Sequence, residues 1–269
     1  MSSLLDHPGS AHAAIDRIAA DSRGVSDDRV AVEAPVAFVY NCASYAVMMA
    51  SPADLEDFAY GFSIAEGIVA DSSEILSVRV TSRGDAFSLS IRIPAERAAA
   101  LAGRSRNVEG RTGCGLCGVT EIAQALRALP VLATTREIPA EALRLALDTL
   151  PSAQPLNLQT GAVHAAAFAG RDGRLLVVRE DVGRHNALDK VIGAAVREGL
   201  DPASGFVVVT SRCSMEMVQK TVTFGCPVLV AVSAPTSLAI TLAQRSRLTV
   251  AAFARGSRLN LYAHPQRIV

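Results

Sequence analysis

The chain has 269 residues, half of them apolar and 19% charged, and its formal net charge is zero. This composition predicts a globular protein with a sizeable core rather than a disordered chain, and the zero net charge removes the global electrostatic case for a nucleic-acid partner. Five unevenly spaced cysteines do not suit a disulfide framework, and no apolar run approaches the roughly 18 residues of a membrane span, so we expect a cytoplasmic protein that contacts neither nucleic acid nor a membrane.

The first 106 residues divide into a tail and a small lobe. Residues 1–29 are rich in Ser, Ala, Asp and His without a sustained period, which predicts a flexible N-terminal tail. Residues 30–106 contain short, alternating apolar runs, which predict a β-rich lobe. Its expected strands cover residues 30–41, 46–49, 75–80 and 86–93, with a turn at residues 82–85.

One helix is expected within this lobe. Ser51 followed by Pro52 has the pattern of an N-cap with proline at the first helical position. Apolar residues at helical spacing follow, and Gly67 is expected to close the helix.

Residues 107–138 are predicted to form a mobile CxxC loop and a following helix over residues 121–129. Cys114 and Cys117 are interleaved with glycines, which remove side-chain shielding and widen the accessible backbone conformations. Neighbouring arginines and the helix N-terminus favour the thiolate form of such a sulfur. The pattern indicates a loop that handles sulfur.

Two other interpretations of this motif stay open. Two cysteines at this spacing are half of a structural zinc site, although Cys42, Cys213 and Cys226 are single, scattered, and expected to be ordinary buried residues. A dithiol redox pair of the thioredoxin type follows a strand in an early βαβ unit, whereas this pair lies in mid-chain after an Arg-rich segment. Persulfide or thiol chemistry therefore stands beside a metal site and dithiol redox chemistry.

Residues 139–269 alternate between helical and strand patterns, which predicts a layered α/β domain. Residues 206–209 are apolar without alternation, as in a sheet that is buried on both faces. The expected helices cover residues 139–150, 186–198, 214–224 and 236–246, and the expected strands cover residues 162–168, 174–179, 205–210, 227–232 and 248–253.

Polar residues gather at the strand–helix junctions of this domain, which is where α/β sheets bind ligands. His164 enters one strand, residues 179–190 and 211–220 join strands to helices, and residues 253–258 follow the last long strand. Helix N-termini combined with Arg, Lys and Gly suit an anionic ligand. The sequence therefore predicts a pocket for such a ligand.

Taken singly, these residues also have structural explanations. His164 suits a satisfied core histidine, Asp181 and Asn186 suit helix caps, and Glu216 with Lys220 suits an ion pair on one helix. Their concentration at one edge of the sheet is what favours a binding site over these explanations.

A series of short motifs runs in order from about residue 33 to the C-terminus. The most specific is Glu-Asp-Val-Gly-Arg-His-Asn at residues 180–186. The others are Asn41, residues 51–57 and 61–67, Cys-Gly-Leu-Cys-Gly at 114–118, residues 160–165, 211–217 and 233–236, and Phe-x-Arg-Gly from residue 253. The series resembles the formate dehydrogenase accessory sulfurtransferases, the FdhD/NarQ family.

This resemblance implies a sulfur carrier, a sulfurtransferase with a cysteine persulfide intermediate. It would take sulfur from a cysteine desulfurase (IscS-type) and pass it to the molybdenum bis(molybdopterin guanine dinucleotide) cofactor that formate dehydrogenase needs. Cys114 would carry the persulfide and Cys117 would be an auxiliary thiol. The predicted cofactor-binding residues are the junction residues His164, Asp181, Arg184, His185, Asn186, Lys190 and Arg212, and the family-matched segment Phe253, Ala254, Arg255, Gly256, Ser257 and Arg258.

The resemblance also implies a homodimer and a C-terminal domain with the cytidine-deaminase-like three-layer α/β/α fold. GDP-like guanine nucleotides are expected to mimic the bound cofactor. His164 is followed by Ala-Ala where a deaminase has His-x-Glu, and the sequence lacks the Pro-Cys-x-x-Cys pair, so no zinc is expected. Two other function classes stay open: a non-catalytic chaperone that binds the guanine dinucleotide without moving sulfur, and a zinc-dependent nucleoside or base enzyme.

Overall fold

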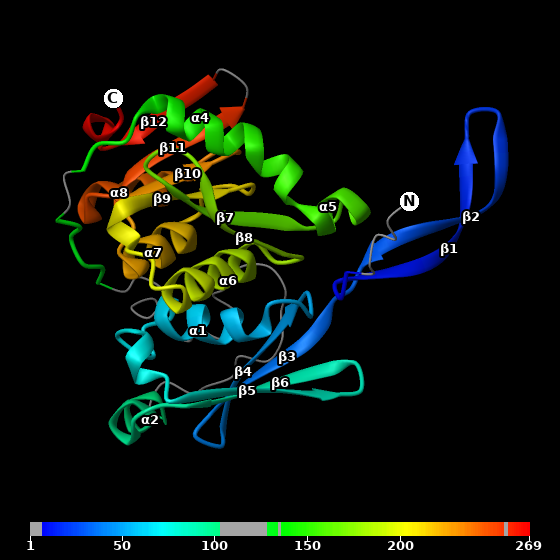
Figure 1. Cartoon of the computed structure of the whole chain (residues 1–269), viewed down its shortest axis with the longest axis horizontal. Helices are drawn as coiled ribbons and strands as arrows, with labels where there is room; N and C mark the ends of the chain where they lie inside the picture. Colours follow the sequence, from blue (N-terminus) through cyan, green and yellow to red (C-terminus); the bar gives the residue numbers. More distant parts are fainter. Residues whose placement is uncertain (1–6, 103–127, 134–135, 256–257) are drawn as a thin grey trace.

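The computed structural model describes residues 7–102, 128–133, 136–255 and 258–269. It has the expected mixed α/β fold, in which a six-stranded sheet with helices on both faces stands above a four-stranded sheet and a two-stranded arm projects from the side (Figure 1). Cys114, Cys117 and most of the helix predicted over residues 121–129 lie outside the described residues.

The arm is an antiparallel hairpin of β1 (Ser10–Ala19) and β2 (Ser22–Ala31). The prediction of a flexible tail over residues 1–29 is therefore wrong for residues 10–29. Every residue of β1 pairs with one of β2 in an unbroken register. Both faces of the hairpin are largely exposed, so its sequence lacks the apolar alternation that marks a half-buried strand, and the pattern could not predict it.

The four-stranded sheet has the order β4-β3-β6-β5 and carries helix α1 (Leu55–Ala65) on one face. Phe38 of the central part of this sheet is buried, and its ring centroid lies 5.0 Å from that of Phe58 and 4.2 Å from that of Phe62. The expected strands are confirmed with shifted ends as β3 (Ala34–Tyr40), β4 (Ala43–Ala50), β5 (Ser77–Arg83) and β6 (Ala86–Arg92), and helix α2 (Ala95–Ala102) follows.

Helix α1 begins later than predicted. Its N-cap is Asp54, which has a left-handed φ of 54°, and Ser51 and Pro52 precede the helix. Ser51 does not cap the helix because its backbone N–H and side-chain oxygen contact the end of a strand in the six-stranded sheet. Gly67 closes the helix as predicted, with a φ of 63° that favours glycine and with its N–H donating to the Ile64 carbonyl.

The six-stranded sheet has the order β12-β11-β10-β9-β7-β8. The strands are β7 (His164–Gly170), β8 (Leu175–Asp181), β9 (Gly205–Val209), β10 (Val228–Ala231), β11 (Thr249–Arg255) and β12 (Arg258–Ala263). The five predicted strands are confirmed, and β12 is an additional one at the edge. Strands β9, β10 and β11 are parallel, whereas β7 runs antiparallel to β9 and β8 antiparallel to β7.

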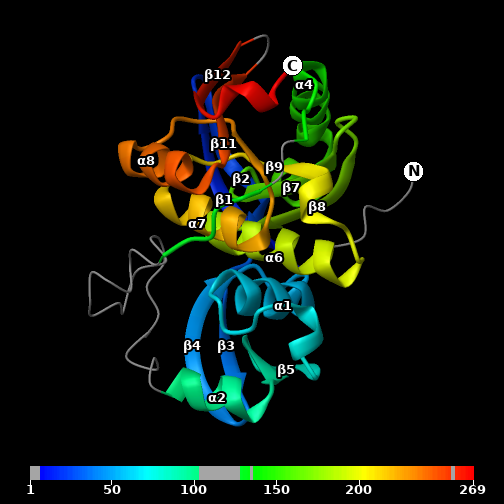
Figure 2. The ribbon, with the colours of Figure 1, turned by 90° about the vertical axis from the view of Figure 1, so that its left-hand side faces the viewer.

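Helices cover both faces of this sheet, which gives three layers (Figure 2). The helices α6 (Arg184–Arg197), α7 (Met215–Phe224) and α8 (Ser237–Ser246) lie on one face, and α4 (Ala140–Thr149) lies on the other. All residues of β9 are buried, as predicted from its unalternated sequence. The short helix α5 (Pro155–Thr160) was not predicted.

The two sheets are joined through the contact of α1 with α6. The helices cross at Gly61 and Gly193, where each backbone lies directly against the other helix. A Cβ atom at Gly61 would lie 2.7 Å from the Gly193 nitrogen and overlap the Asp189 carbonyl oxygen, and one at Gly193 would overlap the Asp57 carbonyl oxygen. One apolar cluster consequently contains buried residues of both sheets and of the helices between them.

Candidate functional site

The polar junctions singled out in the sequence meet at one end of the six-stranded sheet. The parallel strands β9, β10 and β11 end there, β8 also ends there, and β7 begins there, as the pairing of His164 with Asp181 and of Ala166 with Val209 requires. Strand β12 starts at the same end, with Arg258 paired to Arg255. This confirms the expected gathering of the junctions and defines the candidate site.

His185, in the first turn of α6, is the most perturbed titratable group at this end. Its side chain is 8% exposed, and its Nε2 atom lies 4.0 Å from a carboxylate oxygen of Glu216 without a hydrogen-bond partner among the described residues. Burial lowers the pKa of His185 to about 3, and the positive charges of Lys220 and Arg184 act in the same direction. The ring is therefore neutral near pH 7, with one nitrogen able to donate and the other to accept a hydrogen bond.

Ser214 carries a second buried polar atom without a partner. It is the N-cap residue of α7, yet its hydroxyl makes no capping hydrogen bond and is buried without a partner among the described residues. Buried polar atoms are nearly always satisfied in folded proteins, so Ser214 and His185 mark positions where a ligand can supply hydrogen bonds. The backbone N–H groups at the starts of α6 and α7 add partial positive charge beside them.

Charged and aromatic side chains line the rest of this end. His164 is half-buried, and burial followed by the nearby Arg184 lowers the pKa of its imidazole. Arg212 is exposed in the segment between β9 and α7. Phe253 has a left-handed φ of 53° and an exposed ring, with the guanidinium carbon of Arg258 5.3 Å from the ring centroid.

The other predicted residues of the segment after β11 are only partly described. Ala254 is buried and contributes to the core on the α4 face. Gly256 and Ser257 lie outside the described residues, and Arg255 is described only as the last residue of β11. A register shift between Ala252 and Arg255 interrupts the pairing of β11 with β12 beside Phe253.

Asp181, Asn186 and Lys190 form a buried network between the two sheets. Lys190 Nζ lies 2.6 Å from Asp181 Oδ2 and 2.9 Å from the Ser51 carbonyl oxygen, and both charged side chains are fully buried. The amide of Asn186 donates to Asp181 Oδ1 at 2.9 Å and to the Met49 carbonyl at 2.8 Å. Neither Asp181 nor Asn186 is the cap of α6, whose N-cap is Gly183. The side chains of Asp181, Asn186 and Lys190 make these bonds to other protein atoms. Their contact with a cofactor stays a prediction.

Lys220 forms a second buried network, and the expected ion pair with Glu216 is wrong. Its Nζ atom lies 2.9 Å from both carboxylate oxygens of Asp189 and 2.9 Å from Glu66. Burial lowers the pKa of Lys220, but the carboxylates of Asp189 and Glu66 outweigh burial and raise it above its ordinary value. Glu216 faces His185 instead. Helical spacing alone could not predict this, because the stronger partners come from α6 and from the residue that follows α1.

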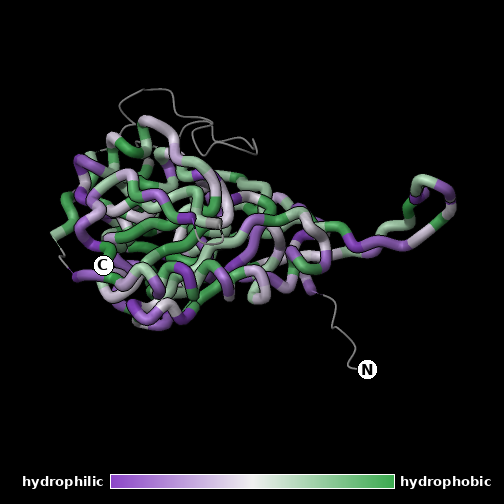
Figure 3. Tube along the Cα trace, turned by 90° about the horizontal axis from the view of Figure 1, so that it is seen from above, coloured by the Kyte–Doolittle hydropathy of each residue, from purple (hydrophilic) through white to green (hydrophobic). Residues whose placement is uncertain are grey.

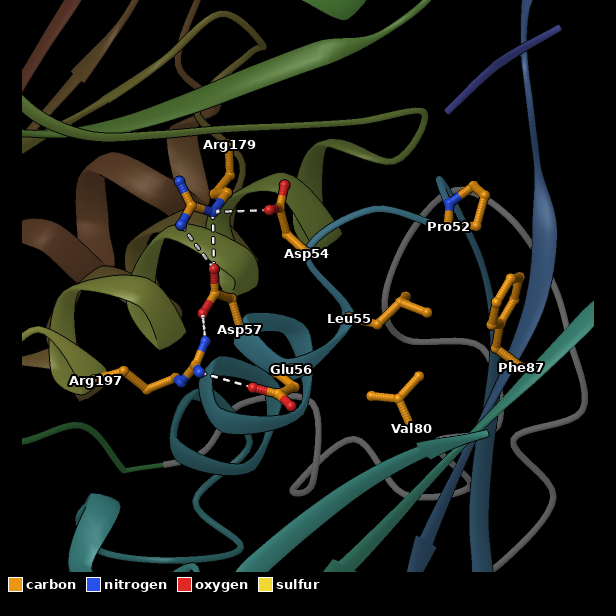
Figure 4. Close-up of a pocket in the computed structure, with 9 residues that line it drawn as sticks. All are labelled: Pro52, Asp54, Leu55, Glu56, Asp57, Val80, Phe87, Arg179 and Arg197. Atoms are coloured by element: carbon orange, nitrogen blue, oxygen red, sulfur yellow. Dashed lines mark hydrogen bonds and ion pairs between the residues drawn. The ribbon is translucent and has the colours of Figure 1, made fainter. Parts of the chain in front are cut away.

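A charged groove between the sheets was missed by the sequence analysis (Figure 4). Arg179 of β8 contacts Asp57 at 2.8 Å and Asp54 at 3.5 Å, and Arg197 of α6 contacts Asp57 and, at 2.7 Å, Glu56. These partners lie more than 100 residues apart in the chain, so no local pattern reveals them.

The cysteines in the described part of the chain differ in exposure. Cys213 and Cys226 are buried as predicted, and burial raises the pKa of each thiol to about 12. The same prediction is wrong for Cys42, which is exposed with a φ of 72° in the two-residue turn between β3 and β4. Within the described residues, no group of three or more His, Cys, Asp or Glu side chains is arranged to hold a metal ion.

A family model described as the FdhD/NarQ family matches residues 31–269. The chain belongs to this family. A protein named "Sulfur carrier protein FdhD" from Xanthomonas axonopodis pv. citri (strain 306) is 51% identical over 261 residues, which cover 97% of this chain and 93% of that protein. A protein of the same name from Bordetella petrii is 46% identical over 241 residues, 90% of this chain and 87% of that protein.

A solved structure has the same overall fold. The crystal structure titled as that of a putative formate dehydrogenase accessory protein from Desulfotalea psychrophila superposes with a TM-score of 0.76 at 28% sequence identity, covering 97% of this chain and 100% of that one. None of the helices in the described residues is both long and apolar enough to cross a membrane.

The most specific FdhD/NarQ motif, residues 180–186, builds the junction of β8 with α6. The carboxylate of Glu180 accepts hydrogen bonds from the backbone N–H groups of Leu156 and Asn157 at 2.8 and 2.7 Å, which holds the start of α5. Asp181 joins the two sheets, and His185 lies in the first turn of α6 with its Nε2 atom 4.0 Å from Glu216. This one motif therefore contacts the start of α5, binds the Ser51 segment and forms the start of α6, all at the end of the sheet where the junctions meet.

Proposed function

We propose that this chain is a cytoplasmic sulfur carrier in the maturation of formate dehydrogenase. It accepts a persulfide sulfur from a cysteine desulfurase on Cys114 and transfers it to the molybdenum bis(molybdopterin guanine dinucleotide) cofactor, which is its substrate. The observation that carries the proposal is 51% identity over 97% of the chain with a protein named as a sulfur carrier of the FdhD type.

The loading step is a thiolate–persulfide exchange. The Cys114 thiolate attacks the outer sulfur of the donor persulfide, a new S–S bond forms on Cys114, the donor's S–S bond breaks, and the donor leaves as a thiolate. No external oxidant is needed, because the oxidation level of the sulfur is carried in the persulfide itself. Cys117 is an auxiliary thiol, and its loss should reduce the yield less than the loss of Cys114.

The end of the six-stranded sheet at which the polar junctions meet is the proposed site for the anionic acceptor. Arg212 and Arg258 supply positive charge there, and the starts of α6 and α7 supply backbone N–H donors. His185 and Ser214 hold buried polar atoms that lack partners, which fits a ligand with its own donors and acceptors. The exposed ring of Phe253 is a flat surface on which a guanine base can stack.

Persulfide formation, measured separately on each cysteine, tests the sulfur-carrier role. The chain is incubated with a cysteine desulfurase and cysteine, and its peptides are analysed by mass spectrometry for the added mass of one sulfur atom. We expect the adduct on Cys114 and its absence in the Cys114→Ala variant, which should also fail to activate formate dehydrogenase in cells that lack the wild-type protein. Full activation by Cys114→Ala would refute sulfur transfer and leave a chaperone that only binds the cofactor.

Binding of GDP tests the proposed acceptor site independently of sulfur. We expect Phe253→Ala and Arg258→Ala each to weaken GDP binding while leaving persulfide formation on Cys114 unchanged, since these residues serve the acceptor and not the donor. GDP affinity that is unaltered in both variants would place the nucleotide elsewhere.

A further inference from the structure

Glu216, in the first turn of α7, carries a carboxylate that is only 12% exposed and accepts no hydrogen bond from another described residue. Hydrophobic stretches of the chain run through the middle of the body when the protein is seen from above (Figure 3), so a carboxylate placed inside it loses hydration and needs donors in return. Lys220, the cation at helical spacing, binds Asp189 and Glu66 instead. Because a carboxylate can only accept hydrogen bonds, a ligand that completes this position must offer donors.

The polar side chains beside this carboxylate do not satisfy it. Nε2 of His185 lies 4.0 Å from a Glu216 oxygen, which is too long for an N–H···O hydrogen bond, and it has no hydrogen-bond partner among the described residues. The hydroxyl of Ser214, two residues before Glu216, is also buried without a partner in the described part of the chain. An acceptor and two further polar groups therefore lie at the starts of two helices, where a bound molecule can use all three.

The start of α7 also supplies donors. Val218 makes the first backbone hydrogen bond of this helix, to the Ser214 carbonyl at 3.3 Å, so the N–H groups of residues 215–217 precede the hydrogen-bonded ladder. Together with the Ser214 hydroxyl, these N–H groups place donors next to the Glu216 acceptor. A ligand that matches this helix start must present an acceptor beside its own donors.

Backbone hydrogen bonds connect this helix start to the proposed base-stacking residue. The Phe253 N–H donates to the Ser233 carbonyl at 3.2 Å. The residues that follow Ser233 are bonded in both directions to Cys213, just before α7. The Cys213 N–H donates to the Ala234 carbonyl at 3.1 Å, and the Thr236 N–H donates to the Cys213 carbonyl at 3.0 Å. Phe253 and the start of α7 therefore flank one short segment.

Guanine is the purine whose edge matches this order of groups. It presents the O6 acceptor beside two neighbouring donors, N1–H and the N2 amino group. A carboxylate can accept from both donors at once while a hydroxyl or a backbone N–H donates to O6. Adenine presents one amino donor beside a ring-nitrogen acceptor, and hypoxanthine lacks the N2 amino group, so neither base supplies a donor to both carboxylate oxygens.

We propose that Glu216 selects guanine over other purines, by accepting hydrogen bonds from N1–H and the N2 amino group of a base that stacks on Phe253. The assignment rests on the proposed function, because the acceptor there is a guanine dinucleotide. It makes Glu216 a specificity-determining residue of the acceptor site, a role that its helical spacing to Lys220 does not indicate.

Binding of GDP and inosine diphosphate (IDP) to the full chain, measured by isothermal titration calorimetry, tests the assignment. We expect the wild type to bind GDP at least about tenfold more tightly than IDP, because IDP lacks the N2 amino donor and leaves one Glu216 oxygen without its partner. In Glu216→Gln this preference should disappear, since the amide offers one acceptor and turns a donor toward the N2 amino group. Glu198→Gln is the matched control, because it removes the same charge at an exposed position, the C-cap of α6, and should keep the wild-type preference.

Xanthosine diphosphate (XDP), which has a carbonyl oxygen in place of the N2 amino group, separates base recognition from a structural role. We expect Glu216→Gln to bind XDP at least about tenfold more tightly than the wild type does, because its amide donates to this oxygen whereas the wild-type carboxylate repels it. A variant that had lost its structure would instead bind every nucleotide more weakly.

Two results would overturn the assignment while GDP binding by the wild type still supports the acceptor site: an unchanged preference for GDP in Glu216→Gln, or no gain of XDP affinity. A wild type that binds no GDP would overturn the assignment and the acceptor site together. Persulfide formation on Cys114 reports on the sulfur-carrier role separately.

Discussion

Replacing Gly61 by alanine should lower the free energy of unfolding by about 2 kcal/mol, although alanine is the better helix former. The added Cβ would lie 2.7 Å from the Gly193 nitrogen and overlap the Asp189 carbonyl, whereas an ordinary contact is 3.4–4 Å. The obstacle is backbone, and the 1.6 Å between the added Cβ and the Asp189 carbonyl oxygen must open to an ordinary contact, so α1 and α6 must move apart by roughly 2 Å, which forfeits about half or more of the dispersion energy across the contact. An overpacking cost of about 3 kcal/mol, reduced by about 1 kcal/mol of helix propensity, gives the expected loss.

Thermal and urea unfolding followed by circular dichroism measure this loss. For a chain of this size, about 2 kcal/mol corresponds to a fall in melting temperature of roughly 4–8 °C. Gly24→Ala is the control, because a Cβ there meets no atom within 4 Å. If Gly61→Ala were as stable as wild type or more stable, the helices would not cross as closely as the structure has them, and the reasoning would fail.

Three further predictions concern individual side chains. Lys190→Met should cost about 3–5 kcal/mol because it leaves the Asp181 carboxylate buried without its cation, and adding Asp181→Asn should restore part of the loss; a single variant as stable as wild type would contradict this. The folded-state pKa of His185, about 3, lies below its unfolded value of 6.5, so the unfolded state binds the proton first and stability should fall from pH 6.5 toward pH 3, by up to about 1.4 kcal/mol per pH unit. Urea midpoints across this range should fall less steeply in His185→Gln, and parallel curves would count against the burial of a neutral ring. Maleimide at about pH 8 should label Cys42 and spare Cys213 in the native protein, as read by peptide mass spectrometry; equal labelling would mean that Cys213 is not buried.

Sequence patterns predicted most elements of the six-stranded sheet because each strand or helix there carries its own apolar signal. The unalternated run at residues 206–209 and the glycine that ends α7 illustrate this, since Gly225 has a left-handed φ of 89°. The arm carries no such signal, because its strands are held by each other and not by a core. The polar residues at the strand–helix junctions also predicted a gathering at one edge of the sheet.

The patterns failed where long-range partners decide the outcome. Ser51 resembles a helix cap, but the buried carboxylate of Asp181, 130 residues away, binds its N–H at 3.0 Å. Lys220 has a carboxylate at helical spacing, yet two carboxylates from other segments hold its ammonium, each at 2.9 Å. A helix cap contributes about 1 kcal/mol and an ion pair at helical spacing a few tenths of a kcal/mol, and both are less than the cost of leaving a buried charge unpaired.

Asp181 constrains how members of this family can diverge. Its two oxygens accept from four donors: the Ser51 and Gly183 backbones, the Asn186 amide and the Lys190 ammonium. A relative that loses the ammonium must also neutralise the carboxylate, so substitutions at positions 181 and 190 should occur together rather than one at a time. Grafting the N-terminal sheet of one member onto the C-terminal domain of another should succeed only when the Ser51 segment and both positions come from compatible parents.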